Sequence, residues 1–135
     1  MTRYLVDTWF LVAHFNRRDP DHDHAERMWR TIDQAQMVTH DAVLAEFLTF
    51  FAEFGPTLRQ KAARAVRNLS LLRFEVVAQD RARFLQALAL YEQRLDKGYS
   101  FADCVSMVVM RERGITHVLT NDHHFREEGF TVLNQ

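Results

Sequence analysis

The amino-acid sequence predicts an α/β domain, a three-layer α/β/α sandwich in which helices cover both faces of a central, mainly parallel sheet. Short β-prone runs alternate with segments of helical spacing along almost the whole chain. Strands that are separated by helical crossovers lie parallel, and their helices pack on the two faces of the sheet. Only 4 glycines and 2 prolines occur, so no flexible linker interrupts this alternation.

Local signals place the individual elements. Strands are expected at residues 3–6, 36–39, 72–77, 117–120 and 130–133. Helices are expected at residues 9–15, 25–32, 42–54, 57–68, 80–95 and 100–114, with a polar loop at residues 16–23. Asp41 is expected to cap the helix at 42–54, Gly55 and Pro56 to end it, and Ser100 and Asp103 have the spacing of a capping box.

Size and composition indicate one domain spanning residues 1–135, because 135 residues with 47% hydrophobic content suffice for a single core. The lone Cys104 is expected to be a small buried hydrophobe in a reducing compartment. No segment resembles a secretory signal or a membrane span, so the sequence predicts a cytoplasmic protein without membrane association. The net charge of −1 argues modestly against a dedicated, high-affinity nucleic-acid binder.

Four acidic residues are expected to meet at one edge of the sheet. In open α/β sheets the functional crevice lies beyond the carboxyl ends of the strands. Asp7 directly follows the first expected strand, Glu46 lies about one turn into the helix after the second, and Asp122 closely follows the fourth. Asp103 begins the helix that leads into that fourth strand, and right-handed crossovers bring the start of this helix to the same edge.

Such a group of carboxylates predicts a metal site. Carboxylates within a few ångströms raise each other's pKa unless cations neutralise them. A ligand set made only of oxygens suits Mg²⁺ or Mn²⁺, ions that activate an attacking water and stabilise the leaving oxygen of a phosphodiester. The pattern therefore predicts hydrolysis by in-line attack of water, and it leaves open whether one or two ions are bound.

Each acid also has a purely structural interpretation. Asp7, Asp103 and Asp122 stand at positions where a carboxylate commonly caps a helix or lies in its first turn. Glu46 lies in a helix that is apolar over most of its circumference, where burial without a partner would be costly. The alternative for Glu46 is a position at the exposed edge of that helix.

Three small polar residues are candidates for supporting the acids. Thr8, Ser106 and Thr120 are expected to donate hydrogen bonds to the carboxylates or to a metal-bound water. Ser106 lies three residues after Asp103 and thus on the same helical face. The competing interpretation is that all three are ordinary small polar residues without a special role.

The sequence resembles the PIN-domain nucleases, and among them the VapC-type toxins of bacterial toxin–antitoxin pairs. The matching motifs, in this order over almost the whole chain, are Leu5-Val6-Asp7-Thr8, Val43-Leu44-Ala45-Glu46, Ser100-Phe101-Ala102-Asp103 and Leu119-Thr120-Asn121-Asp122-His123-His124-Phe125. The resemblance implies Mg²⁺- or Mn²⁺-dependent endonucleolytic cleavage of RNA, a homodimer and inhibition by a small antitoxin. The four acids fall on the family's acidic positions, and Thr120 falls on its usual hydroxyl before the last acid.

Further polar and aromatic clusters have weaker functional interpretations. Arg64 and Arg67 share one face of the helix at 57–68, and His123 follows Asp122, so each is a candidate contact to RNA or to an acidic partner. The polar cluster at residues 19–24 is interpreted as a solvated loop rather than a metal site. The phenylalanines at 47, 50, 51 and 54 are interpreted as core, with a share available for a dimer or antitoxin interface.

Two other function classes compete with a nuclease. An aspartate-based phosphotransfer enzyme also places Asp after parallel strands, but Trp9 stands where a haloacid-dehalogenase pattern has its second acid. A receiver domain has a late lysine, and here the last one, Lys97, precedes the final strands. Nucleotide-binding glycine motifs are absent from the sequence. The main alternative is a non-catalytic PIN-like module that binds RNA or protein.

Overall fold

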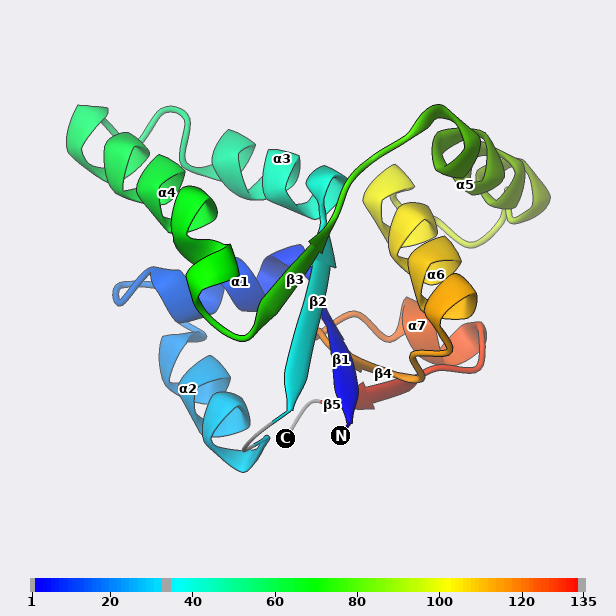
Figure 1. Ribbon diagram of the computed structural model, residues 1–135, viewed down its shortest axis with the longest axis horizontal. Coiled ribbons are helices and arrows are strands. Elements are labelled where there is room, and N and C mark those ends of the chain that lie inside the picture. The colour runs from blue at the N-terminus through cyan, green and yellow to red at the C-terminus, as the bar shows by residue number, and fades with distance from the viewer. Residues whose placement is uncertain (1, 33–34, 134–135) are drawn as a thin grey trace.

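The computed structural model describes residues 2–32 and 35–133 and has the expected three-layer architecture (Figure 1). The strands are β1 (Arg3–Val6), β2 (Gln36–His40), β3 (Phe74–Val77), β4 (His117–Leu119) and β5 (Thr131–Leu133). The helices are α1 (Thr8–Phe15), α2 (His22–Thr31), α3 (Asp41–Phe50), α4 (Pro56–Asn68), α5 (Arg81–Gln93), α6 (Phe101–Arg113) and α7 (His124–Glu127), with a 3₁₀ turn at Leu69–Leu71.

The strands form one sheet in the order β3-β2-β1-β4-β5, and every pair is parallel. The prediction of a central, mainly parallel sheet is thus confirmed. From β1 the chain builds outward through β2 to β3, then crosses back to place β4 on the other side of β1. The order in which strands are added therefore reverses between β1 and β4. Open α/β sheets have their functional crevice at such a reversal.

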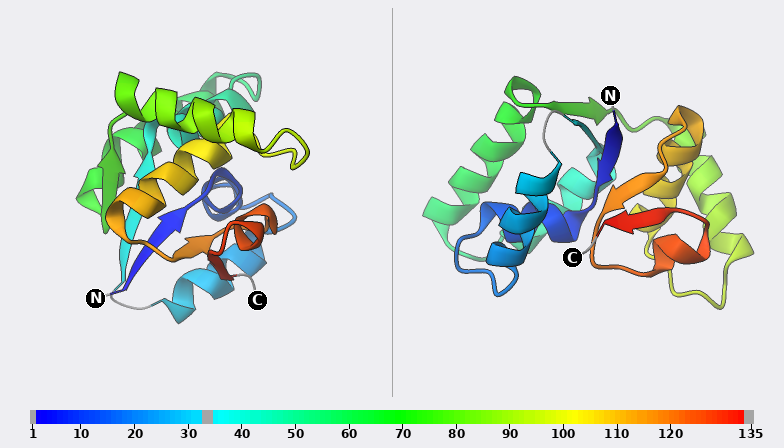
Figure 2. Two further views of the ribbon diagram at one scale, coloured as in Figure 1. Left: turned by 90° about the vertical axis from the view of Figure 1, so that its right-hand side faces the viewer. Right: turned by 90° about the horizontal axis from the view of Figure 1, so that it is seen from below.

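Helices cover both faces of the sheet. Helices α1 to α4 lie on one side and α5 to α7 on the other, a separation that is also clear in the rotated views (Figures 1 and 2). Successive strand residues point to opposite faces. Val6 and Leu119 pack into the core beneath α1 to α4, and their neighbours Leu5 and Val118 pack into the core beneath α5 and α6. Burial on both faces explains why these strands read as continuous apolar runs.

The prediction that Asp41 caps α3 is wrong. His40 is the N-cap, and its Nδ1 accepts the backbone N–H of Val43 at 3.4 Å, whereas the carboxylate of Asp41 accepts the N–H of Gln79 at 2.9 Å. Burial lowers the pKa of His40 to about 4, so its ring is neutral and its Nδ1 has a free lone pair. Asp41 already lies inside the helix and binds the strand-to-helix connection beyond β3 instead.

Several element ends also differ from the expectations. Helix α3 ends at Phe50 rather than at residue 54, and Gly55, with φ of 94°, precedes α4. Helix α2 begins at His22, so the loop after α1 is shorter than expected. It is held by a hydrogen bond from Trp9 Nε1 to Asp21 Oδ2 at 3.1 Å. Helix α7 was not expected, because four residues are too few to show a helical period.

Two further expectations concern Cys104 and the membrane. Cys104 is a free, fully buried thiol, as predicted, and burial raises its pKa to about 11. Within residues 2–32 and 35–133, no helix combines the length and the apolar character that crossing a bilayer requires.

Replacing Ser100 by Ala is expected to reduce the free energy of unfolding by about 1 kcal/mol. The Ser100 hydroxyl accepts the backbone N–H of Asp103, and the Asp103 carboxylate accepts the N–H of Ser100, both at 3.0 Å, in the predicted capping box. Urea unfolding monitored by circular dichroism measures the loss. Ser100→Thr keeps the hydroxyl and is the matched control, and equal stability of the Ala and Thr variants would contradict this role of the cap.

Candidate active site

The candidate active site lies where β1 and β4 end side by side, and Asp7 is at its centre. The backbone N–H of Asp7 donates to the carbonyl of Leu119 at 3.2 Å, which ties the ends of the two strands together. The hydroxyl of Thr120 donates to Asp7 Oδ2 at 2.7 Å and accepts the backbone N–H of Asp122 at 3.0 Å. One hydroxyl therefore fixes Asp7 and the turn that carries Asp122.

Asp7 does not cap helix α1. It occupies the N-cap position, but its side chain makes no cap hydrogen bond, and the residue is only 6% exposed. The capping interpretation thus fails for Asp7. It holds in part for Asp103, because one carboxylate oxygen of Asp103 closes the capping box of α6.

The carboxyl groups are close enough to repel one another. Burial raises the pKa of Asp7 to about 7, and the charges of Asp103 and Glu46 add to this rise, although hydrogen bonds from Thr120 and Thr8 oppose it. Burial likewise raises the pKa of Asp103 to about 6, helped by Asp122 and Glu46 and opposed by Ser100. Asp103 and Glu46 therefore lie within electrostatic reach of Asp7, and Asp122 and Glu46 lie within electrostatic reach of Asp103.

No arginine or lysine of the described chain forms an ion pair with Asp7, Asp103, Glu46 or Asp122. Glu128 provides the contrast within the same molecule. Burial by itself would raise its pKa, but hydrogen bonds from Arg94, Arg111 and Tyr99 lower it to about 2. The fold thus neutralises one buried carboxylate with arginines and leaves the acid group at the ends of β1 and β4 without such partners.

Glu46 lies at the exposed edge of α3, the alternative that the sequence analysis left open for it. Helix α3 buries only Val43, Leu44 and Phe47, a narrower stripe than its apolar sequence indicates. Glu46 still reaches the other acids, because the hydroxyl of Thr8, next to Asp7, donates to Glu46 Oε1 at 2.6 Å. The fourth carboxylate therefore approaches the site from the solvent side.

Asp122 and His124 complete the group on the other side. Potential ligand atoms of Asp103, Asp122 and His124 all lie within 4.8 Å of one another, which is close enough to share one metal ion. The backbone N–H of His124 donates to Asp122 Oδ1 at 2.9 Å, so Asp122 also orders the start of α7. The sequence analysis named its neighbour His123, and not His124, as the candidate contact to RNA or a partner.

Ser106 contacts His40 on the neighbouring strand β2. Its hydroxyl lies 2.7 Å from Nε2 of the buried, neutral His40. Because Nδ1 of His40 accepts from Val43, Nε2 carries the proton and donates to Ser106. Ser106 thus links α6 to the N-cap of α3.

The three residues expected to contact RNA or a partner are exposed. Arg64 and Arg67 lie on the outer surface of α4, and neither makes an ion pair with a described residue. His123 is exposed beside the acid group, with its ring centroid 5.1 Å from that of His124.

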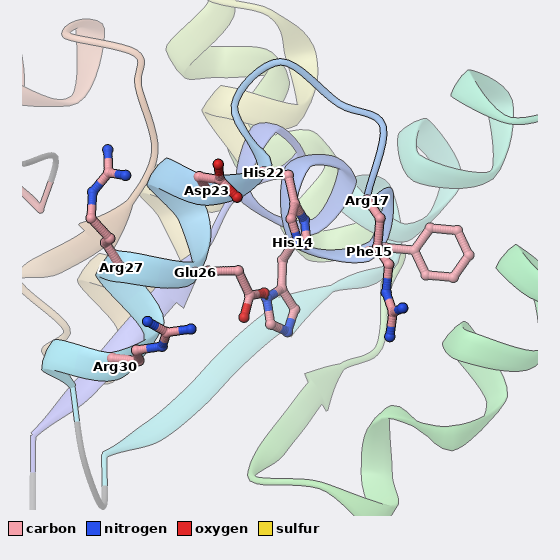
Figure 3. A pocket seen from close by; sticks show the side chains of 8 residues that line it. All are labelled: His14, Phe15, Arg17, His22, Asp23, Glu26, Arg27 and Arg30. Carbon is pink, nitrogen blue, oxygen red and sulfur yellow. The ribbon is translucent and has the colours of Figure 1, made fainter.

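A second polar hollow of about 710 Å³ lies between α1 and α2 and contains none of the four acids (Figure 3). His14 Nδ1 lies 2.6 Å from Glu26 Oε1 at its floor, and Arg17, Arg27 and Arg30 surround the opening. The polar cluster at residues 19–24 contributes His22 and Asp23 to this hollow. In the described part of the chain, that cluster brings no three ligand atoms close enough to share a metal ion.

Comparisons with known proteins identify the class. The PIN-domain family model matches residues 4–130, and the chain belongs to the PIN-domain family. The chain is 33% identical over 129 residues, 96% of each chain, to the 23S rRNA-specific endonuclease VapC20 of Mycobacterium tuberculosis. The predictions of the fold, of the VapC-type family and of a nuclease are thus confirmed.

Solved structures agree with this assignment. The crystal structure of M. tuberculosis VapC20, a sarcin–ricin loop cleaving toxin, superposes with a TM-score of 0.85 at 29% identity, covering 98% of this chain and 99% of VapC20. VapBC2 from Rickettsia felis, bound to a fragment of promoter DNA, shares the fold with a TM-score of 0.70 at 14% identity, with 98% of each chain covered.

The stability that Asp7 contributes to the metal-free protein is expected to fall as the pH rises from about 4 to about 7. The folded-state pKa of Asp7, about 7, lies above its ordinary value of 3.8, so protonated Asp7 contributes stability that is lost as the pH rises through about 7. One such carboxyl gives a slope of up to about 1.4 kcal/mol per pH unit. Urea unfolding in EDTA at several pH values measures this slope. Because Asp103 and the neutral His40 also make stability depend on pH, the test is the difference in slope between the wild type and Asp7→Asn. The exposed-site control Asp96→Asn should keep the wild-type slope, and equal slopes of the wild type and Asp7→Asn would contradict the electrostatics described above.

Proposed function

We propose that this chain is a Mg²⁺- or Mn²⁺-dependent endoribonuclease whose site consists of Asp7, Glu46, Asp103 and Asp122. The observation that carries the proposal is the burial of Asp7 and Asp103 next to each other without an arginine or lysine partner among the described residues. Such a pair weakens the fold at neutral pH unless a cation is bound. A divalent cation is the natural complement of this arrangement.

The donor atoms fit such an ion. Carboxylate oxygens suit Mg²⁺ and Mn²⁺, and Asp7, Asp103 and Asp122 would hold the ion, with Glu46 at the solvent side. A bound divalent ion supplies activation of water and stabilisation of negative charge on a phosphodiester.

The chain's own hydroxyl groups orient the ligands. Thr120 holds Asp7 Oδ2 at 2.7 Å, and Ser100 holds one oxygen of Asp103 through the capping box. Thr8 holds Glu46 Oε1 at 2.6 Å, on the side where a substrate phosphate and water have access. Hydroxyl donors fix these carboxylates without adding positive charge, so their capacity to bind a cation is kept.

Ribosomal RNA is the substrate that we propose first, and 23S rRNA in particular. Support comes from the 33% identity to VapC20 over 96% of both chains, because VapC20 is named as a 23S rRNA-specific endonuclease. We propose that Arg64, Arg67 and His123 contact RNA phosphates or the partner protein. Their exposure and lack of ion pairs support this role.

The two rival functions are less well supported. A non-catalytic binding module has no use for carboxyl groups whose burial raises their pKa, since replacing them would stabilise the fold. An aspartate-based phosphotransfer enzyme uses one nucleophilic Asp and forms an acyl-phosphate, which does not require four acids. Both rivals are distinguished in the same assay.

Purified protein is expected to cleave labelled 23S rRNA, in ribosomes or free, when Mn²⁺ or Mg²⁺ is present and not in EDTA. Asp7→Asn and Asp103→Asn should each lower the rate on the order of a hundredfold or more, because each removes a charged group from the site. Gel analysis of cleavage products measures the rate, and Asp96→Asn, outside the site, is the control. Absence of cleavage with either ion would favour the binding module, and a stable acyl-phosphate would favour the phosphotransfer enzyme.

We propose two protein partners, a small antitoxin and a second copy of the chain. Similar solved structures are toxin–antitoxin complexes, which supports the antitoxin. Large exposed apolar side chains support a homodimer. They include Phe50 at the end of α3, Phe54 in the turn after it, and Leu85 and Leu88 on α5, whereas Phe47 and Phe51 are buried in the core.

Sedimentation equilibrium at micromolar concentration is expected to give a dimer. Leu88→Glu and Phe54→Glu place a charge on the two apolar surfaces, and the variant whose surface forms the interface should shift toward the monomer, because a charge at an apolar interface is costly to desolvate. The other variant then serves as the control. A monomeric wild type would contradict the homodimer. Co-expression with the product of a short upstream overlapping gene, where one exists, tests the antitoxin by co-purification.

A further inference from the structure

We infer that His124 is a nitrogen ligand of the cation, bound together with Asp103 and Asp122; this inference rests on the proposed function. It changes the expected ligand set from oxygens alone to oxygens with one imidazole nitrogen. The sequence motif does not require this, because a metal-activated water needs no histidine base. The inference depends on where the fold places the ring of His124.

The position of the imidazole nitrogen is the first argument. Ligand atoms of Asp103, Asp122 and His124 lie within 4.8 Å of one another. Nδ1 of His124 lies 3.1 Å from Asp122 Oδ1, but the alignment of the two atoms does not make a hydrogen bond. Nδ1 is also inaccessible to solvent, so it gains no hydrogen bond from water at the surface. A nitrogen lone pair beside a carboxylate oxygen, without a shared hydrogen bond, is the arrangement that a bridging cation completes.

The second argument is that the surrounding structure holds the ring in place. The ring centroid of Tyr99 lies 5.3 Å from that of His124, and Tyr99 is itself only 5% exposed. The hydroxyl of Tyr99 donates to Glu128 Oε2 at 2.9 Å. Glu128 in turn forms ion pairs with Arg94 and Arg111, both at 2.8 Å. This network connects the end of α5, the end of α6 and the residue after α7.

Contacts on both sides of His124 in the chain also fix the position of helix α7. Phe125, the residue after His124, is fully buried in the core beneath α5 and α6. The backbone N–H of His124 is held by Asp122 Oδ1 at 2.9 Å. The backbone on both sides of the His124 ring is therefore anchored, and such preorganisation is what a metal ligand requires.

An imidazole ligand changes which ion the site prefers. Mg²⁺ is a hard ion that takes oxygen ligands and keeps several waters, whereas imidazole suits the transition-metal ions. Loss of His124 should therefore weaken Mn²⁺ binding more than Mg²⁺ binding. An ordinary ion pair between a protonated His124 and Asp122 would have no such consequence, so metal selectivity separates the two interpretations.

The test is the direct environment of bound Mn²⁺, measured by pulsed electron paramagnetic resonance on the full chain without RNA. The echo decay of wild-type protein should show modulation from an imidazole nitrogen. His124→Gln should abolish this modulation. It should also weaken Mn²⁺ affinity about tenfold or more beyond any loss of Mg²⁺ affinity, because losing a metal ligand costs at least as much affinity as losing a residue that hydrogen-bonds to a ligand. His123→Gln, which removes the exposed neighbour, is the matched control and should keep the modulation.

The outcomes distinguish this inference from the proposed function. Mn²⁺ binding without nitrogen modulation in the wild type would overturn the assignment of His124 and leave the acidic site intact. Modulation that disappears in His123→Gln and persists in His124→Gln would overturn it as well. Failure of wild-type protein to bind Mn²⁺, together with absence of RNA cleavage, would instead contradict the proposed function. The wild-type measurement needs no substitution, so it remains decisive even where a variant does not fold.

Discussion

The burial of Asp7 and Asp103 beside the ends of β1 and β4, without an arginine or lysine partner among the described residues, is the constraint on which the rest of this structure depends. Asp7 and Asp103 are almost completely removed from water, which raises the pKa of both, and the charge of Asp103 raises the pKa of Asp7 further. Replacing one of them by an apolar side chain of similar size would make the fold more stable. The packing of β1 between β2 and β4, together with the capping box of α6, instead holds both acids in place.

Glu128 demonstrates that this protein does neutralise a buried carboxylate where no ligand is needed. Arg94, Arg111 and Tyr99 surround it, and its pKa falls to about 2. Around Asp7 the donors are the hydroxyl of Thr120 and backbone groups, none of which carries a positive charge. A nearby positive charge stabilises a buried carboxylate. At Glu128 arginines supply that charge, whereas the acid group around Asp7 has no arginine or lysine partner among the described residues and can take up a cation.

The two halves of the molecule contribute different parts of the site. Helices α1 and α3, on one side of the sheet, bring Asp7 with Thr8 and the exposed Glu46. Helices α6 and α7, on the other side, bring Asp103 and His124 (Figure 1). Because the strand order reverses between β1 and β4, residues from the helices on both faces of the sheet meet at this point. The cation that we propose there would link the two helical layers.

The sequence by itself determined the layer architecture and the convergence of acids at one sheet edge. Both follow from short-range regularities, since apolar periodicity fixes the elements and an acid after a parallel strand must lie at the carboxyl edge. Only the tertiary structure decided which side chains meet. Ser106 shares a helical face with Asp103, yet its hydroxyl binds His40, and Glu46 lies at the surface although its helix is apolar in sequence. The place of His124 depends on the network of Tyr99 and Glu128, contacts between elements far apart in the chain that no local pattern encodes.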